Sequence, residues 1–345
     1  MSKQVILLTN LGSPDSTEVK DLRRYLDEFL MDKRVMDLPY LRRLLLVRGI
    51  IIPSRAPKSA EKYKMIWTED GSPLIVITND LAKKVGEVSK LPTYVCMRYG
   101  NPTPASALQK IELEHPDVEE VVLFPLYPHY AMSSYETAVE HVKSAYKKGQ
   151  FNFDLKVVAP YYNYSKYVSS LVSTIQPFLN EKKYDHILFS YHGVPERHIL
   201  KGDITGTHCL KTENCCSVES SAHAQCYRHQ VLETTRLVVQ ELKLDADAYT
   251  VSYQSRLGRS KWLTPSTSSS LNQLPARGVK KLLVVSPAFV SDCLETLEEI
   301  HMEGRETFMD AGGELYDTVP CLNSNDEWVK TIVELVKNEF SLQKV

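Results

Sequence analysis

The chain has 345 residues, and its 41 Lys and Arg against 43 Asp and Glu give a formal net charge of −2. This near-balance argues against a nucleic-acid binder that relies on bulk charge. A hydrophobic content of 43% and a mean hydropathy of −0.26, without a long uncharged apolar run, predict a folded chain with no membrane span. The length suits two domains of ordinary size.

The N-terminus and the cysteines indicate the compartment. The sequence MSKQVILLTN reaches an apolar strand within four residues, which leaves no room for an export signal. We therefore expect a cytoplasmic protein. Four of the seven cysteines lie in one short stretch: Cys209, Cys215, Cys216 and Cys226. Without an export signal, such a group favours metal ligation over disulfides.

Short β-branched runs alternate with amphipathic segments, which is typical of an α/β fold. We expect two doubly wound domains of similar topology, residues 1–165 and 166–324, each with a parallel four-stranded sheet flanked by helices. A C-terminal helix is predicted within 325–345. The eight predicted strands are 5–9, 93–97, 121–124, 156–159, 186–191, 248–253, 281–286 and 314–319.

The segment 38–56 is rich in Leu, Ile and Arg and shows little alternation. It is either a packed helix that forms the lip of a pocket or a lid. An apolar helix flanked by arginines can also touch a bilayer surface, so a peripheral membrane contact is an alternative.

Arginine, tyrosine and serine side chains occur in two loops of the first half. They are Arg55, Tyr63 and Ser72, followed by Arg98 and Tyr99 at the end of a predicted strand. Arginine in a loop is usually a surface group, but its planar fork also suits a carboxylate, because it can bond both oxygens.

One histidine ends a predicted strand of the second half. The run 186–191 leads into His192, and Gly193 and Pro195 then prevent regular continuation. Ligands of open α/β sheets lie at the carboxyl ends of the strands. A neutral imidazole there can bind a metal or accept a proton near pH 7, although it can equally satisfy a turn carbonyl.

A row of carboxylates follows the strand predicted at 281–286. Glu295, Glu299 and Glu303 are four residues apart and share one face of a helix. A solvated acidic face is the alternative, but like charges at this spacing repel and no lysine lies in the segment. Together with the histidine and the arginines, the row favours a site where a planar, anionic ligand receives a cation.

Six motifs form a series along the chain. They lie at 11–14, 98–99, 124–128, 190–195, 254–258 with 262–263, and 289–299. In this order they resemble the motifs of bacterial ferrochelatases, and the resemblance covers nearly the whole chain. It implies two Rossmann-like, chelatase-type domains around a cleft. It also implies a lyase that inserts ferrous iron into protoporphyrin IX to form protohaem in haem biosynthesis.

The resemblance also implies roles for individual residues. His192 and Glu295 match the metal-binding and catalytic pair, and Glu299 and Glu303 continue a proton or metal relay along a helix locally wider than an α-helix. Iron and porphyrin are then the substrates. The residues expected to contact the porphyrin are Leu11, Arg55, Tyr63, Ser72, Arg98, Tyr99, Tyr127 and Trp262.

Other functions stay open at this stage. One is a chelatase for another tetrapyrrole, either coproporphyrin III with iron or a precursor that receives cobalt. The other is a protein that binds a metal or a tetrapyrrole without turnover. We expect no nucleotide, because neither G-x-x-x-x-G-K-[ST] nor G-x-G-x-x-G occurs. No nucleic-acid partner is expected, and the chain is either a monomer or a homodimer.

The cysteine-bearing insertion at 203–226 departs from the commonest ferrochelatase pattern. Some ferrochelatases carry a [2Fe-2S] cluster, often on a C-terminal extension, and this chain has no such tail. Four thiolates suit a [2Fe-2S] cluster, and the adjacent Cys215 and Cys216 lack the C-x-x-C spacing of common zinc sites. We expect an internal cluster on Cys209, Cys215, Cys216 and Cys226, with structural zinc or free thiols as alternatives.

Overall fold

The structure is a computed structural model that describes residues 3–256, 258, 260–338 and 342–345. It contains two compact units. Unit 1 consists of Met1–Tyr127, Met132–Ala159 and Asn323–Val345, and unit 2 consists of Pro128–Ala131 and Pro160–Leu322. Leu257 of the predicted motif at 254–258 and residues 339–341 of the predicted C-terminal helix lie outside the described residues.

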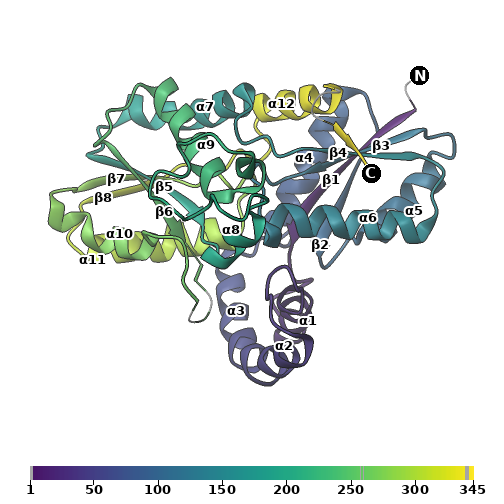
Figure 1. Cartoon of the computed structure of the whole chain (residues 1–345), viewed down its shortest axis with the longest axis horizontal. Coiled ribbons are helices and arrows are strands. Elements are labelled where there is room, and N and C mark those ends of the chain that lie inside the picture. The colour runs from purple at the N-terminus through teal and green to yellow at the C-terminus, as the bar shows by residue number, and fades with distance from the viewer. Residues whose placement is uncertain (1–2, 257, 259, 339–341) are drawn as a thin grey trace. The chain divides into compact units, whose positions relative to one another are not determined.

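Unit 1 is built on a five-stranded sheet in the order β2-β1-β3-β4-β9 (Figure 1). A short strand, β9 (Leu342–Lys344), pairs antiparallel with β4. The other pairs are parallel, and β1 and β3 are almost fully buried because helices cover both faces of the sheet. These parallel strands are β1 (Gln4–Gly12), β2 (Thr93–Tyr99), β3 (Glu120–Pro125) and β4 (Asp154–Val158).

Helices pack on both faces of this sheet. On one face α4 (Pro73–Ser89) packs with α12 (Asp326–Lys337), and on the other α5 (Pro104–Glu114) packs with α6 (Thr137–Gly149) (Figure 1). Helix α12 packs on the sheet through its apolar stripe, in which Trp328 is fully buried. The C-terminal helix is therefore part of unit 1.

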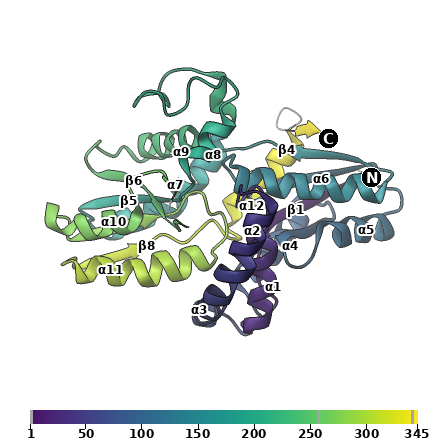
Figure 2. The ribbon, with the colours of Figure 1, turned by 60° about the horizontal axis from the view of Figure 1, so that its bottom comes forward.

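Three further helices of unit 1 stand away from its sheet after β1 (Figure 2). They are α1 (Val19–Leu30), α2 (Tyr40–Leu46) and α3 (Ile52–Ile66), with the π-helical turn η1 (Val47–Ile51) between the last two. Helix α1 packs against α3. The segment 38–56 is helical from Tyr40 onwards, because α2, η1 and the start of α3 follow one another there. It leaves an exposed apolar surface made of Tyr40, Leu41, Leu45 and Ile50.

Unit 2 is built on a parallel four-stranded sheet in the order β6-β5-β7-β8. Its strands are β5 (His186–His192), β6 (Tyr249–Gln254), β7 (Lys281–Val285) and β8 (Leu315–Thr318). Two helices pack together on each face (Figures 1 and 2). They are α7 (Ser165–Glu181) with α9 (Tyr227–Leu242), and α10 (Thr267–Gln273) with α11 (Gly304–Asp310).

Short helical turns complete both units. Unit 1 contains the π-helical turn η2 (Met132–Glu136) directly before α6. Unit 2 contains α8 (Glu196–Gly202) and the turns η3 (Ser221–Gln225) and η4 (Pro275–Arg277). It also contains a longer π-helix, η5 (Glu295–Glu303).

The two sheets repeat one topology. The order β2-β1-β3-β4 of unit 1 matches β6-β5-β7-β8 of unit 2, and all eight predicted strands are present. The α/β, doubly wound prediction is therefore confirmed, except that β9 makes the first sheet five-stranded. In each unit the order reverses direction once, between β1 and β3 and between β5 and β7. Such switch points are where open α/β sheets bind ligands, outside the carboxyl ends of the strands.

Candidate active site

The switch point of unit 2 carries the predicted metal-binding pair. His192 is the last residue of β5, and the loop after β7 leads into η5, whose first residue is Glu295. Because β5 and β7 are neighbouring parallel strands, their carboxyl ends meet at one edge of the sheet. We call this edge, with His192 and the carboxylates of η5, the metal edge.

The imidazole of His192 has a defined orientation. Its Nδ1 lies 2.6 Å from the carbonyl oxygen of Gly193, and its ring lies 6.4 Å from that of Phe289. A carbonyl only accepts hydrogen bonds, so in the neutral ring Nδ1 carries the proton and Nε2 keeps its lone pair. Nε2 has no hydrogen-bond partner among the described residues. His192 can therefore bind a metal or accept a proton through Nε2.

The carboxylate row lies on a π-helix, which confirms the predicted widening. In η5 the amide of Gly304 donates to the carbonyl of Glu299, which is the five-residue spacing of a π-helix. Glu295 and Glu299 are half-buried and Glu303 is exposed. The Glu299 carboxylate accepts a hydrogen bond of 2.5 Å from the Ser255 hydroxyl. The row thus runs from the protein interior towards solvent.

A buried thiol lies beside the first carboxylate of this row. Burial, together with the charge of Glu295 and a hydrogen bond to it, raises the pKa of Cys293 well above its usual value. The thiol therefore stays protonated and donates to the carboxylate. This contact helps to hold the Glu295 carboxylate in place.

Gln254 connects the two predicted metal ligands, and the sequence analysis gave it no role. It ends β6 and faces His192 in the strand register. Its carbonyl oxygen accepts a 2.7 Å hydrogen bond from the amide of Gly193, while its side-chain amide donates to the carbonyl of Glu295 at 3.1 Å. Gln254 thus fixes both main-chain segments, one through its main-chain carbonyl and the other through its buried side chain, and a polar residue at a strand end was the available signal.

Trp262 packs on the turn after His192. Its side chain is 9% exposed, and its indole N–H has no hydrogen-bond partner among the described residues. A Cβ at position 193 would lie 3.3 Å from this ring and 2.8 Å from the Gln254 carbonyl. Only glycine allows this close approach, so Gly193 lets the ring lie directly beside the metal edge.

The switch point of unit 1 carries two other predicted contact residues. Leu11 lies near the end of β1, Tyr127 follows β3 by two residues, and both are partly exposed. Gly12 ends β1 with a φ of +98°, and a Cβ there would lie 1.8 Å from the carbonyl oxygen of Tyr99. A glycine is therefore required where β1 passes β2.

The three predicted porphyrin contacts Arg55, Tyr63 and Ser72 differ in their exposure to solvent. Arg55 lies on α3 and is exposed. Tyr63, on the same helix, is 8% exposed and packs edge-on against Tyr25 at 6.4 Å. Ser72 is 5% exposed and begins α4. Only Arg55 of these three extends its side chain into solvent.

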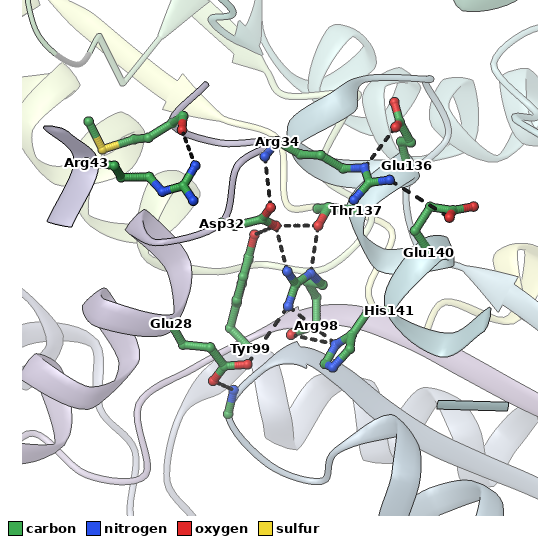
Figure 3. Close-up of polar contacts among 12 residues, drawn as sticks. Glu28, Asp32, Arg34, Arg43, Arg98, Tyr99, Glu136, Thr137, Glu140 and His141 are labelled. Carbon is green, nitrogen blue, oxygen red and sulfur yellow. Dashed lines mark hydrogen bonds and ion pairs between the residues drawn. The ribbon is translucent and has the colours of Figure 1, made fainter. Parts of the chain in front are cut away.

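Arg98 belongs to a closed polar network, which differs from its predicted place in a ligand-facing wall (Figure 3). Its guanidinium bonds the Asp32 carboxylate at 2.6 Å and the Thr137 hydroxyl at 2.8 Å, and it lies 4.2 Å above the Tyr99 ring. The Tyr99 hydroxyl donates to Asp32 at 2.9 Å, and Tyr99 is fully buried. We call this group the arginine network.

Charges around the arginine network perturb its titratable groups (Figure 3). Burial raises the pKa of Asp32, but hydrogen bonds from Thr137 and the Arg34 amide, with the charge of Arg98, outweigh it and lower the pKa. Burial, reinforced by Arg98, lowers the pKa of His141 to about 4. Asp32 is therefore ionised and His141 neutral near pH 7, which keeps the network intact.

The four clustered cysteines converge in unit 2. The thiol of Cys226 hydrogen-bonds with Cys216 and Cys209, and Arg228 donates to Cys215 at 3.6 Å. The bond with Cys216 lowers the pKa of Cys226 to about 6, against the effect of burial, with help from the His229 amide. The Asp203 carboxylate accepts from the amides of His208 and Cys209 at 2.8 Å, which closes the start of the loop.

No three His, Cys, Asp or Glu side chains in the described ranges are arranged as ligands of one metal ion. In the same part of the chain, no helix combines the length and the apolar character that a bilayer crossing requires.

The comparisons with known proteins agree over the whole length. The family model described as Ferrochelatase matches residues 3–340. The chain is 44% identical over 340 residues to the ferrochelatase of Opitutus terrae, covering 98% of both chains. It is 45% identical over 337 residues to that of Stutzerimonas stutzeri, covering 97% of this chain and 98% of the relative.

Solved structures support the fold. The structure of SirB from Bacillus subtilis with Fe³⁺ aligns with a TM-score of 0.53 and 10% identity, over 98% of this chain and 95% of that one. SirB from Bacillus subtilis subspecies spizizenii, a sirohydrochlorin chelatase in complex with cobalt, aligns with a TM-score of 0.53 and 8% identity. At this identity the likeness supports the chelatase-type fold alone.

Proposed function

Because the chain belongs to the ferrochelatase family, we propose that it is a lyase that inserts ferrous iron into protoporphyrin IX, forming protohaem in haem biosynthesis. The observation that carries the proposal is the metal edge, where His192 keeps the lone pair of Nε2 and the carboxylates of η5 continue from Glu295. Ferrous iron and the porphyrin are both substrates.

The chemistry of insertion assigns roles to these side chains. Two N–H protons occupy the centre of a free porphyrin and must leave as iron enters. Nε2 of His192 would take a proton or bind iron, and Glu295 would supply a hard oxygen ligand. Glu299 and Glu303 would pass protons along η5 towards solvent, or metal in the opposite direction towards Glu295. No step in this exchange transfers an electron.

The porphyrin contacts are also a proposal. We infer that Leu11, Tyr127 and Trp262 present apolar surface to the macrocycle, and that Arg55 pairs with a propionate, which its planar guanidinium suits. Arg98, Tyr99, Tyr63 and Ser72 would support the surrounding surface, because their side chains are largely buried or already bonded. Binding energy at such contacts can hold the ring in a distorted shape.

We infer that Cys209, Cys215, Cys216 and Cys226 hold a [2Fe-2S] cluster. Four thiolates are the donor set that such a cluster requires, and the thiols of Cys209 and Cys216 already bond that of Cys226. Sulfur that accepts hydrogen bonds from Arg228 and from the His229 amide is typical of cluster ligands. When bound, the cluster would supply a stabilising or sensing group. Structural zinc is the alternative.

Location and assembly follow as further proposals. We propose that the protein works in the cytoplasm, as a monomer or a homodimer. The exposed apolar side chains of α2 and η1, Leu41, Leu45 and Ile50, would let it touch a bilayer surface, from which a poorly soluble porphyrin could be received.

The test is a spectroscopic assay of the anaerobically purified protein. Added Fe²⁺ should convert the absorption bands of protoporphyrin IX to those of haem with many turnovers per enzyme. Glu295→Gln should still bind the porphyrin but lose insertion, whereas Glu306→Gln, an exposed carboxylate on α11 outside the row, should keep it. A visible absorption of the isolated protein that dithionite bleaches would support the cluster, and a colourless protein containing zinc would refute it.

Two results would change the proposed function. Conversion of coproporphyrin III with iron, or insertion of cobalt, in preference to protoporphyrin IX with iron would indicate another chelatase. Stoichiometric binding of unmetallated porphyrin, unchanged in Glu295→Gln and without turnover of any of these substrates, would indicate a carrier.

A further inference from the structure

The peptide group that follows His192 is held at both ends. Its carbonyl oxygen, from His192, accepts a 2.9 Å hydrogen bond from the Tyr227 hydroxyl. Its N–H, from Gly193, donates to the carbonyl of Gln254 at 2.7 Å. The next carbonyl along the chain, that of Gly193, is the one that orients the imidazole through Nδ1. Fixing this peptide therefore fixes the ring.

Tyr227 reaches His192 from the start of α9. It is the first residue of that helix, and Cys226 is the residue that caps it. The side chain is 5% exposed and packs edge-on against the ring of His129 at 6.0 Å. Its hydroxyl therefore approaches His192 from a tightly packed interior, with little freedom to move.

Cys226 joins this helix start to the cysteine group. Its thiol is the one that hydrogen-bonds with both Cys216 and Cys209. Its main chain is bonded on both sides: the amide donates to His223 in the loop at 3.3 Å, and the carbonyl accepts from Gln230 in the helix at 3.1 Å. A displacement of this thiol must therefore move the first turn of α9.

We propose that Tyr227 is a positioning residue that couples the cysteine group to His192. Tyr227 directly follows Cys226 in the chain. A change in the hydrogen bonds among the four thiols therefore shifts the Tyr227 hydroxyl. That hydroxyl fixes the peptide whose neighbouring carbonyl orients the imidazole. The effect on turnover rests on the proposed role of His192 in iron insertion, while the effect on the imidazole itself does not.

The first test removes the hydroxyl in Tyr227→Phe. The matched control is Tyr191→Phe, since the Tyr191 hydroxyl is also buried, bonds Thr235 of α9 at 2.7 Å, and leaves the His192 peptide untouched. In Tyr227→Phe we expect kcat for iron insertion to fall about tenfold, because misplaced catalytic groups lose orientation, with KM for the porphyrin unchanged. Tyr191→Phe should keep kcat within about twofold.

A second readout does not depend on turnover. In protein labelled with ¹⁵N-histidine, the His192 imidazole signals can be assigned by their loss in His192→Ala. They should shift or broaden in Tyr227→Phe and stay unchanged in Tyr191→Phe. Unchanged His192 signals in Tyr227→Phe, or equal effects of the two variants, would overturn the positioning role. A wild-type protein without turnover would refute the proposed function alone, because the imidazole signals still test the position of the ring.

The coupling itself is tested by a double-mutant cycle. Cys209→Ser changes one of the thiols that bond Cys226. Cys226 lies seventeen positions later in the chain, directly before Tyr227. It should change the His192 signals in the wild-type background and add nothing in the Tyr227→Phe background. Equal and additive changes in both backgrounds would overturn the coupling. If Cys209→Ser does not fold, Cys216→Ser, which alters the other thiol bonded to Cys226, provides the same comparison.

Discussion

The arginine network of unit 1 and the metal edge of unit 2 differ in how their polar groups are used. In the arginine network, the guanidinium of Arg98 is bonded to Asp32 and Thr137, and Tyr99 closes the group from below (Figure 3). At the metal edge, hydrogen bonds hold the main chain around His192, while Nε2 has no partner among the described residues. The polar groups of the arginine network bond one another, whereas the metal edge leaves one imidazole nitrogen without a partner among the described residues.

This difference separates stability from function at similar places in the fold. Both groups follow parallel strands in sheets of the same order, where polar residues are expected to serve ligands. A buried ion pair that is fully bonded instead holds its own elements together, and losing one partner is costly. The difference predicts that changes at the metal edge affect turnover and that changes in the arginine network affect unfolding.

The largest expected effect is that of His192→Ala. Removal of the imidazole should lower kcat for iron insertion by about 10³-fold, because the group proposed to accept a proton or bind iron is lost. The unfolding midpoint should stay within about 2 °C, since the half-buried ring has one hydrogen bond and that bond lies within its own turn. A large fall in the unfolding midpoint would show that His192 stabilises the fold, and it would contradict the predicted difference between the metal edge and the arginine network.

The next effect is that of Asp32→Asn. The change leaves Arg98, whose side chain is 13% exposed, with only the more distant Glu28 at 3.9 Å as a charged partner, and it should lower the free energy of unfolding by about 3 kcal/mol. Because the pKa of Asp32 is lowered on folding, its contribution is present above the unfolded pKa and is lost as the pH falls below about 4. Urea unfolding at pH 7 measures the loss, and the kcat of the folded fraction should stay within about threefold of wild type.

A smaller effect concerns the pH dependence of unfolding. The unfolded state protonates His141 near its ordinary pKa, whereas the folded state does so only near about 4. As the pH falls from about 6.5 to 4, the unfolding free energy should therefore fall, by about 2 kcal/mol after allowance for partial exposure. His141→Gln should remove this slope in urea titrations, whereas the exposed His301→Gln should keep it.

The smallest expected effect sharpens the description of the carboxylate row. Glu299→Gln should lower kcat about tenfold, because this half-buried carboxylate follows Glu295 on η5. Glu303→Gln, at the exposed end, should stay within about twofold. Steady-state rates at saturating porphyrin measure both. Equal losses in the two variants would contradict a gradient from the interior to solvent.

Much of the fold could be predicted from local sequence patterns. Most of the eight parallel strands contain short buried runs with β-branched residues, and such runs are visible without tertiary information. Strand β9 could not be predicted, because its residues Leu-Gln-Lys carry no strand pattern and pair only at an open sheet edge. The helix that was predicted within residues 325–345 therefore ends earlier than expected, at Lys337.

The site could be predicted less completely, because its contacts are distant in sequence. His192 and the glutamate row stand out by type and spacing. The partner of Arg98, however, is 66 positions away, and the bond from Gln254 to Glu295 spans 41. No local pattern indicates that Arg98 is saturated or that Gln254 joins the two predicted ligands. Family resemblance supplied the motifs but not these connections.

The place of α12 and β9 at the end of the chain determines when unit 1 can be completed during synthesis. Both elements complete unit 1, yet they follow all of unit 2 along the chain. At ribosomal rates, the residues between 160 and 323 take on the order of 10–30 s to synthesise. During that interval the surfaces of unit 1 that α12 covers, including α4 and the Phe124 ring that contacts Trp328, have no cover. Unit 2 can thus fold while the earlier-made unit 1 is still incomplete.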